Sequence, residues 1–153
     1  MLGPLPAGTR IHVGEAKRQA LETTLHLWDA TEALGLGATL PSRIAAAGVA
    51  EVAQDMYPRQ VALGRTPSLS AVVDLRLSDA SGAEGGKPGL IVRLGPVGEP
   101  RADASRPADA TLELTAEDAL LLLWKRRDLT TVDARLTGSR AALERVLAHP
   151  LVP

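Results

Sequence analysis

Glu22, His26 and Asp29 are the residues of this sequence whose types and spacing point most directly to chemistry. Residues four apart on a helix share a face, because the helix repeats every ~3.6 residues. The Glu22 carboxylate and a His26 ring nitrogen can therefore converge on Zn²⁺ or another divalent ion. Asp29, three residues after His26, could orient the second ring nitrogen, as carboxylates beside metal ligands do. The spacing therefore predicts two metal ligands with a supporting acid.

A solvated polar stripe is the alternative interpretation of the same residues. Glu15, Arg18, Glu22, His26 and Asp29 follow one another at spacings of three and four. Such rows commonly face water and are linked by i,i+4 pairs, here Arg18 with Glu22. Two ligands do not make a tight metal site, so the spacing alone leaves both interpretations open.

Composition is that of an ordinary soluble domain. The chain has 153 residues, 45% of them apolar and 23% charged, which suits one compact domain or one domain with an appendage. A net charge of −1 with scattered cations argues against nucleic acid and anionic membranes as partners. Cysteine is absent, which is compatible with the cytoplasm, and we expect no signal peptide and no membrane span.

The hydrophobic period changes along the chain from helical to alternating. It predicts helices over residues 13–34, ended by Gly35 and Gly37, and over 41–57, where Pro58 should kink or end the helix. Alternating apolar residues then predict strands, the first two forming a hairpin, at 69–78, 89–95, 109–115 and 131–137. Further helices are expected over 116–126, with Thr115 as N-cap, and over 139–148.

These elements predict an α+β fold, in which a four-stranded sheet carries helices on one face and follows two N-terminal helices. Phenylalanine is absent, so the core must consist of Leu, Val, Ala and Ile around Trp28 and Trp124.

The second half of the chain resembles a known family. The matching segments, in order, are residues 73–79, 108–114, 118–126 and 136–143. They are similar to the C-terminal domain of the mycothiol-dependent maleylpyruvate isomerase family of actinobacteria. The resemblance implies that residues 40–153 form this domain and that its fold is like that of sterol carrier proteins.

The first helix resembles the last helix of the family's N-terminal domain, a DinB-like four-helix bundle. The resemblance assigns residues 1–39 to this helical segment, with most of the bundle absent, and makes Glu22 and His26 ligands of a divalent metal, usually zinc. In the family a histidine from an earlier bundle helix completes the set. Here the other histidines are His12 and His149, and nothing in the sequence near either argues that it is the third ligand.

Arg126 matches a family arginine that is thought to bind the anionic substrate. The family usually has Trp-Gly-Arg at this place, whereas this chain has Lys125 between Trp124 and Arg126 and a second arginine, Arg127, after it. A guanidinium group binds carboxylates through two parallel hydrogen bonds, so the role is chemically sensible. The alternative is that these cations complement the negative end of the preceding helix.

Three functions are compatible with the sequence. The first is a shortened, metal-binding member of the mycothiol-dependent family, inactive alone or dependent on a partner. The second is a non-catalytic module of sterol-carrier type that binds a small acidic or apolar ligand. The third is a protein-interaction domain that associates with itself or a partner through its N-terminal helix. All three would place the protein in the cytoplasm.

Overall fold

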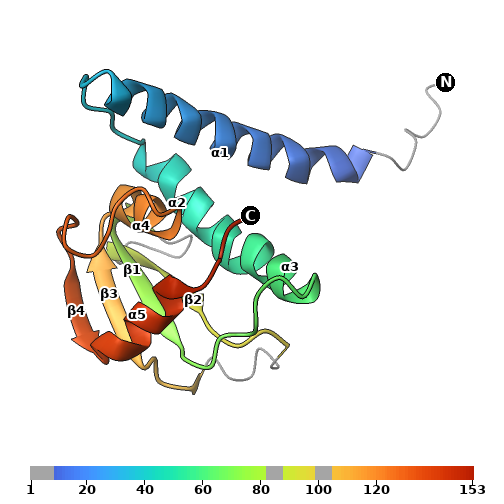
Figure 1. Cartoon of the computed structure of the whole chain (residues 1–153), viewed down its shortest axis with the longest axis vertical. Helices are drawn as coiled ribbons and strands as arrows, with labels where there is room; N and C mark the ends of the chain where they lie inside the picture. The colour runs from blue at the N-terminus through green and yellow to red at the C-terminus, as the bar shows by residue number, and fades with distance from the viewer. Residues whose placement is uncertain (1–8, 82–87, 99–104) are drawn as a thin grey trace. The chain divides into compact units, whose positions relative to one another are not determined.

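The computed structural model describes residues 9–81, 88–98 and 105–153 and divides into two compact units, residues 1–40 and 41–153 (Figure 1). The first unit contains the 25-residue helix α1 (Thr9–Ala33). This helix begins four residues earlier than the sequence predicts, so His12 lies within the helix and not before it. None of the helices in the described ranges is long and apolar enough to cross a membrane.

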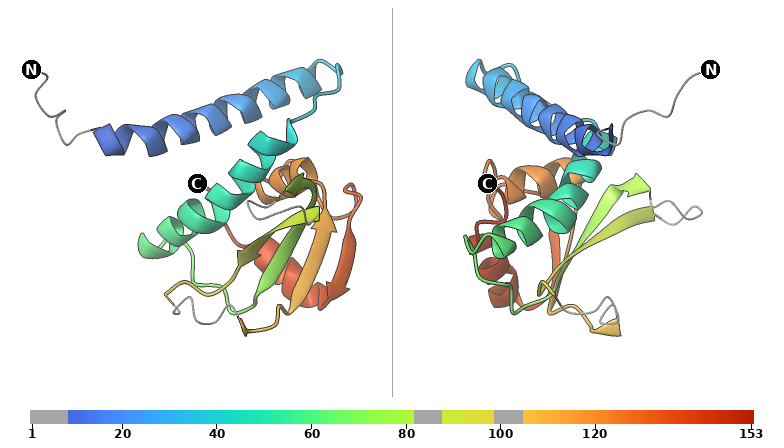
Figure 2. Two further views of the ribbon diagram at one scale, coloured as in Figure 1. Left: turned by 180° about the vertical axis from the view of Figure 1, so that it is seen from behind. Right: turned by 90° about the vertical axis from the view of Figure 1, so that its right-hand side faces the viewer.

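The second unit is an α+β layer in which helices cover one face of a four-stranded sheet (Figure 2). This arrangement confirms the predicted fold class. Its elements are α2 (Ser42–Glu51), the π-helix η1 (Val52–Met56), α3 (Tyr57–Ala62), β1 (Val73–Ser81), β2 (Pro88–Leu94), β3 (Ala110–Leu114), α4 (Ala116–Leu123), β4 (Arg135–Gly138) and α5 (Arg140–Ala148).

The sheet is mixed, with strand order β2-β1-β3-β4. β1 and β2 form the predicted antiparallel hairpin, whose connecting residues 82–87 lie outside the described ranges. β1 runs parallel to β3, and β4 returns antiparallel to β3. On β1 the side chains of Val73, Leu75 and Leu77 are fully buried, and the alternate side chain of Arg76 is exposed. The period of two in the sequence therefore marks the face that the helices cover.

The second helix does not end at Pro58 but continues through η1 and α3 to Ala62. Pro58 lies in the first turn of α3, where a missing N–H group costs least. The π-helix η1 comes directly before it and changes the hydrogen-bond register there. The predicted end at residue 57 was therefore wrong. The π-helical turn before Pro58 lets the helix continue past a residue that has no N–H group to donate.

β1 begins at Val73 and not at residue 69, although the apolar alternation begins earlier. The N–H of Leu69 donates to the Tyr57 hydroxyl over 2.7 Å, and the N–H of Val72 donates to Asp109 Oδ2 over 2.7 Å. The side chains of Tyr57 and Asp109 therefore bind backbone N–H groups that would otherwise donate to a neighbouring strand. The segment before β1 is bent at residues 70 and 71 and is partly buried without being part of the sheet.

β4 likewise starts at Arg135, later than the predicted residue 131. Before it, Asp128 holds a turn in which Thr130 donates to its Oδ1 through both the amide and the hydroxyl. The hydroxyl and then the amide of Thr130 are the main groups that lower the pKa of the Asp128 carboxyl. These local bonds commit the backbone of the segment to a turn.

Asp109 joins three segments of the second unit. Its N–H donates to the carbonyl of Val72 over 2.8 Å, while its carboxylate accepts from the Val72 N–H. Its own carbonyl accepts from the Ser139 N–H over 2.8 Å. Gly138 has φ +91°, and a Cβ there would lie 2.5 Å from the Asp109 carbonyl oxygen. Asp109 therefore connects the entry to β1, the start of β3 and the join between β4 and α5.

Replacing Asp109 with alanine is expected to lower the free energy of unfolding by about 1–2 kcal/mol, because the Val72 N–H loses a charged acceptor. Chemical denaturation of the full chain measures this change. Asp133→Ala removes an exposed carboxylate from the segment before β4 and serves as the control, with an expected change within about 0.5 kcal/mol. Equal stability of the two variants would show that the Asp109 side chain does not hold the junction.

Candidate functional site

Glu22, His26 and Asp29 all lie on α1. The Nδ1 atom of His26 is 3.7 Å from Oδ2 of Asp29, and the His26 side chain is 76% exposed. Such a contact is an ion pair only when the ring is protonated. Glu22 precedes His26 by four residues and so shares its side of the helix.

The described residues do not complete a metal centre around this pair. In residues 9–81, 88–98 and 105–153, no group of three or more His, Asp or Glu side chains is placed to hold a metal ion. His149 belongs to the second unit, where it follows α5, and the side chain of His12 is outside what the structure describes. A catalytic zinc ion takes three protein ligands and a structural one takes four. Glu22 and His26 alone do not fit either kind of zinc site.

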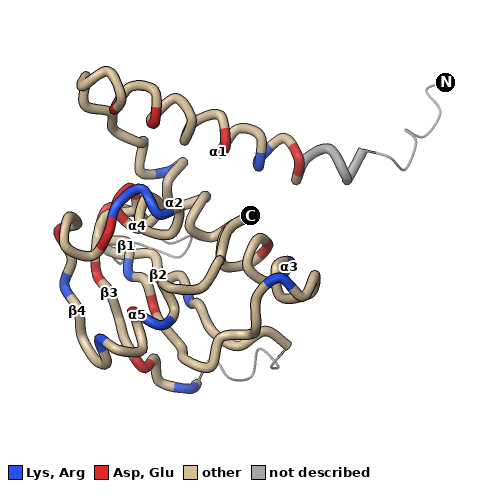
Figure 3. The backbone as a smooth tube through the Cα atoms, viewed as in Figure 1, with Lys and Arg blue, Asp and Glu red and all other residues tan. Residues whose placement is uncertain are grey.

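The C-terminal end of α4 carries the basic residues 125–127, which form a continuous stretch in Figure 3. The N–H of Lys125 donates to the Leu122 carbonyl over 3.1 Å, and the N–H of Arg126 donates to the Leu121 carbonyl over 2.8 Å. These two bonds define a Schellman motif, whose central residue must have positive φ. Lys125 occupies that position with φ 59°. Burial lowers the pKa of its ammonium group.

Arg126 and Arg127 have different contacts. The Arg126 guanidinium lies 5.6 Å from the centroid of the Trp124 ring, and its Nη1 donates to the Trp124 carbonyl over 3.1 Å. Arg126 thus makes the helix-end contact that the alternative interpretation describes. Arg127 donates through Nη1 to Oδ1 of the mostly buried Asp118. Arg127 is therefore held by an acid of α4, and Arg126 is the cation that stacks on an aromatic ring.

The N-terminus of α4 is capped twice. Thr115 accepts a hydrogen bond from the N–H of Asp118 over 3.1 Å, which confirms the predicted N-cap. Asp79 Oδ1 accepts from the N–H of Ala116 over 2.7 Å. The Asp118 carboxylate pairs with Arg127, so it links the beginning of the helix to the turn after its end.

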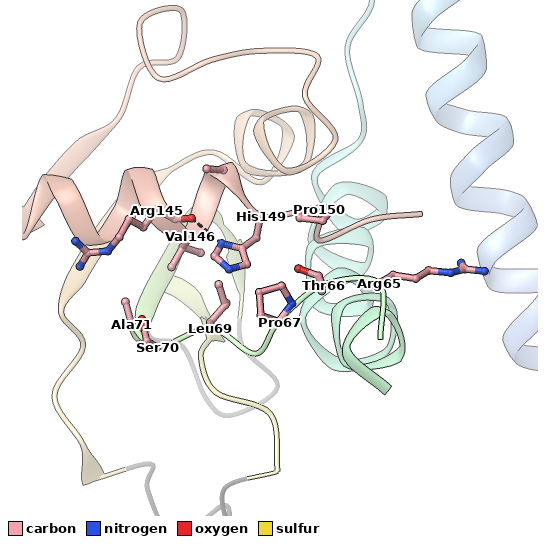
Figure 4. A pocket seen from close by; sticks show the side chains of 11 residues that line it. Arg65, Thr66, Pro67, Leu69, Ser70, Ala71, Arg145, Val146, His149 and Pro150 are labelled. Atoms are coloured by element: carbon pink, nitrogen blue, oxygen red, sulfur yellow. Dashed lines mark hydrogen bonds between the residues drawn. The ribbon is translucent and has the colours of Figure 1, made fainter. Parts of the chain in front are cut away.

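A hollow of about 510 Å³ opens elsewhere in the second unit, between the segment before β1 and the end of α5 (Figure 4). We call it the α5-end hollow. Its volume and mostly apolar lining are typical of small-molecule sites. Its lining residues are Arg65, Thr66, Pro67, Leu69, Ser70, Ala71, Arg145, Val146, Ala148, His149 and Pro150.

Sequence reasoning did not find the α5-end hollow. It considered His149 only as a third metal ligand, and it assigned Leu69 and Ala71 to a strand. The lining comes from two segments nearly eighty positions apart, 65–71 and 145–150, so no local spacing connects them. The nearest indication in the sequence is a histidine placed directly before Pro150, where the last helix must stop.

A family model described as "MDMPI C-terminal domain" matches residues 43–145. The chain belongs to this family, that of the mycothiol-dependent maleylpyruvate isomerase. No curated protein and no solved structure matches the chain. The likeness to sterol carrier proteins therefore stays a prediction.

The family match covers α2 to most of α5 and includes the turn 124–127. Glu22, His26 and Asp29 lie before the matched region, and His149 lies after it. Family membership therefore supports the position of Arg126 within the domain, while the metal ligands rest on the resemblance of α1 alone.

Lys125→Gly is expected to raise the free energy of unfolding by about 1 kcal/mol, because glycine adopts positive φ without a steric penalty. Chemical denaturation measures the change. Lys125→Ala is the matched control, since it removes the charge but keeps a Cβ at the same φ. A glycine variant no more stable than the alanine variant would show that this turn is not strained.

Zinc binding is expected to be weak, with well under one ion per chain after dialysis, because Glu22 and His26 provide only two ligands. Metal analysis of the dialysed chain and of His26→Ala checks this, and the variant should retain still less zinc. Stoichiometric zinc that survives dialysis and disappears in His26→Ala would contradict the weak-site prediction. Residual zinc that is unchanged in the variant would identify the solvated stripe.

Proposed function

We propose that this chain supplies the C-terminal-domain half of a mycothiol-dependent, maleylpyruvate isomerase-like site, and that a protein partner supplies most of the metal-binding half. The observation that carries the proposal is the family match over residues 43–145. In this proposal the chain has no isomerase activity alone, because its described residues provide only two candidate metal ligands.

Arg126 is the residue of this chain that would contact the anionic substrate. Its guanidinium lies over the Trp124 ring and is bonded to the Trp124 carbonyl, so its plane is fixed before a ligand arrives. A guanidinium group that is already fixed loses less conformational entropy when it binds a carboxylate. The Arg127–Asp118 ion pair holds the turn from the other side.

The partner would dock on α1. Leu27 of α1 is a large apolar residue that remains exposed, and so are Leu34 and Leu36 in the turn after the helix. Exposed apolar groups on a helix and in the turn that follows it suit a helical partner or a second copy of the chain. The proposal places this assembly in the cytoplasm, with which a chain without cysteine is compatible.

A ligand-binding module without catalysis is the second candidate function. The α5-end hollow favours it, because it has the size and lining of a small-molecule site within the second unit alone. A module of this kind would need neither the metal nor α1.

Arg126→Ala is expected to weaken maleylpyruvate binding to the full chain by about tenfold, since a charged hydrogen bond contributes about 1.5–3 kcal/mol. Amide chemical shifts followed by NMR during titration give the affinity and the location. Arg135→Ala, which removes an exposed arginine of β4, is the matched control and should bind like the original chain.

The same samples, supplied with zinc and mycothiol, should show no isomerisation above the protein-free rate. Turnover by the chain alone would contradict dependence on a partner. Binding that is unchanged in Arg126→Ala would remove Arg126 from the proposed site.

A further inference from the structure

The α5-end hollow lies within residues 41–153 and shares no residue with the turn 124–127. It therefore goes beyond the proposed family site. Most of its lining is apolar, and two polar groups, the Thr66 hydroxyl and the His149 ring, face one another across it in Figure 4. Pockets that combine an apolar wall with a few placed polar groups bind small molecules by shape and orient them by hydrogen bonds.

Thr66 carries a buried hydroxyl without a described partner. The residue is 4% exposed, and its Oγ1 has no hydrogen bond to any described group. A buried polar atom without a hydrogen bond destabilises the folded state, so native structures usually provide a partner. Figure 4 shows the Thr66 oxygen directed into the hollow, toward His149. The hydroxyl is therefore placed to bond to something that enters the hollow.

His149 presents its Nε2 atom to the same space. Its Nδ1 lies 2.8 Å from the Arg145 carbonyl oxygen, which can only accept, so Nδ1 carries a hydrogen in both charge states of the ring. Nε2 points away from that carbonyl and toward Leu69 (Figure 4). Nε2 is an acceptor in the neutral ring and becomes a donor when the ring is protonated.

The charges around the hollow favour an anion. Arg65 and Arg145 are the charged residues of its lining besides His149, and the lining contains no Asp, Glu or Lys. Figure 4 shows both guanidinium groups extending outward on opposite sides, so they contribute a positive potential without filling the space. A carboxylate has two oxygens and can accept from both Thr66 and a protonated His149.

We propose that the α5-end hollow binds a small monocarboxylic acid. The carboxylate accepts hydrogen bonds from the Thr66 hydroxyl and from Nε2–H of protonated His149. The apolar part of the acid lies against Leu69 and Val146.

Hexanoate and benzoate are the probes, and hexanol and benzyl alcohol are their uncharged counterparts. NMR titration of the full chain should shift the amide signals of residues 65–71 and 145–149. The acids should bind at least about tenfold more tightly than the alcohols, because only the acids satisfy two donors with one charged group.

The Thr66→Val variant tests the effect of the hydroxyl on binding separately from its effect on stability. The variant should bind hexanoate about tenfold more weakly, yet its Tm should be equal to or above that of the original chain, because an unpartnered buried hydroxyl is replaced by a methyl group. Thr137→Val, on exposed β4, is the matched control and should leave binding unchanged. His149→Ala removes the second donor and should also bind hexanoate about tenfold more weakly.

The proposal is overturned if the alcohols bind as tightly as the acids, or if either Thr66→Val or His149→Ala binds hexanoate normally. It is also overturned if hexanoate at millimolar concentration leaves the signals of residues 65–71 and 145–149 unshifted. The two tests use different ligands, variants and amide signals, so failure here and failure of the proposed family site are told apart.

Discussion

The hydrogen bonds of Asp109 are the constraint on which the second unit depends. Three chain segments, which enter β1, begin β3 and join β4 to α5, meet at this residue. β1 and β3 are parallel neighbours, and a parallel pair needs a crossover that no tight turn can provide. The Asp109 side chain and backbone together bind both polar groups of Val72, so the register of this parallel pair is set at its first residues. The Asp109 carbonyl then accepts from Ser139, so the same point also fixes where α5 begins.

Gly138 shows how tight this junction is. A side chain there would overlap the carbonyl oxygen that Ser139 binds, and the positive φ of Gly138 is open to glycine without penalty. Ser139 then caps α5 by accepting from the N–H of Ala142. Sequence reasoning predicted that the strand ends at residue 137 and that the helix begins at residue 139. It could not identify why a glycine is required, because the overlapping oxygen belongs to a residue about thirty positions earlier.

The sequence predicted elements whose pattern is local and missed features that depend on distant partners. The alternation in β1 and the Thr115 cap depend on neighbouring residues, and both were found. The start of β1 was misplaced, because Tyr57 and Asp109 bind the backbone of residues 69–72 from elsewhere in the chain. Tyr57 is 2% exposed, and its hydroxyl accepts a hydrogen bond from the N–H of Leu69. Because Leu69 lines the α5-end hollow, Tyr57 also helps to position the wall of that hollow. Neither consequence has a signature in the spacing of nearby residues.

The turn after α4 positions Arg126 although Lys125 holds a positive φ that glycine would adopt without penalty. A side chain at positive φ costs about 1–2 kcal/mol, and such strain persists only where the surroundings over-determine the backbone. Here the two Schellman hydrogen bonds and the Arg127–Asp118 ion pair hold the backbone of the turn in this conformation. The Arg127–Asp118 ion pair thus ties the turn to the beginning of α4. Arg126 remains over Trp124 because of these contacts, so its geometry does not require the glycine.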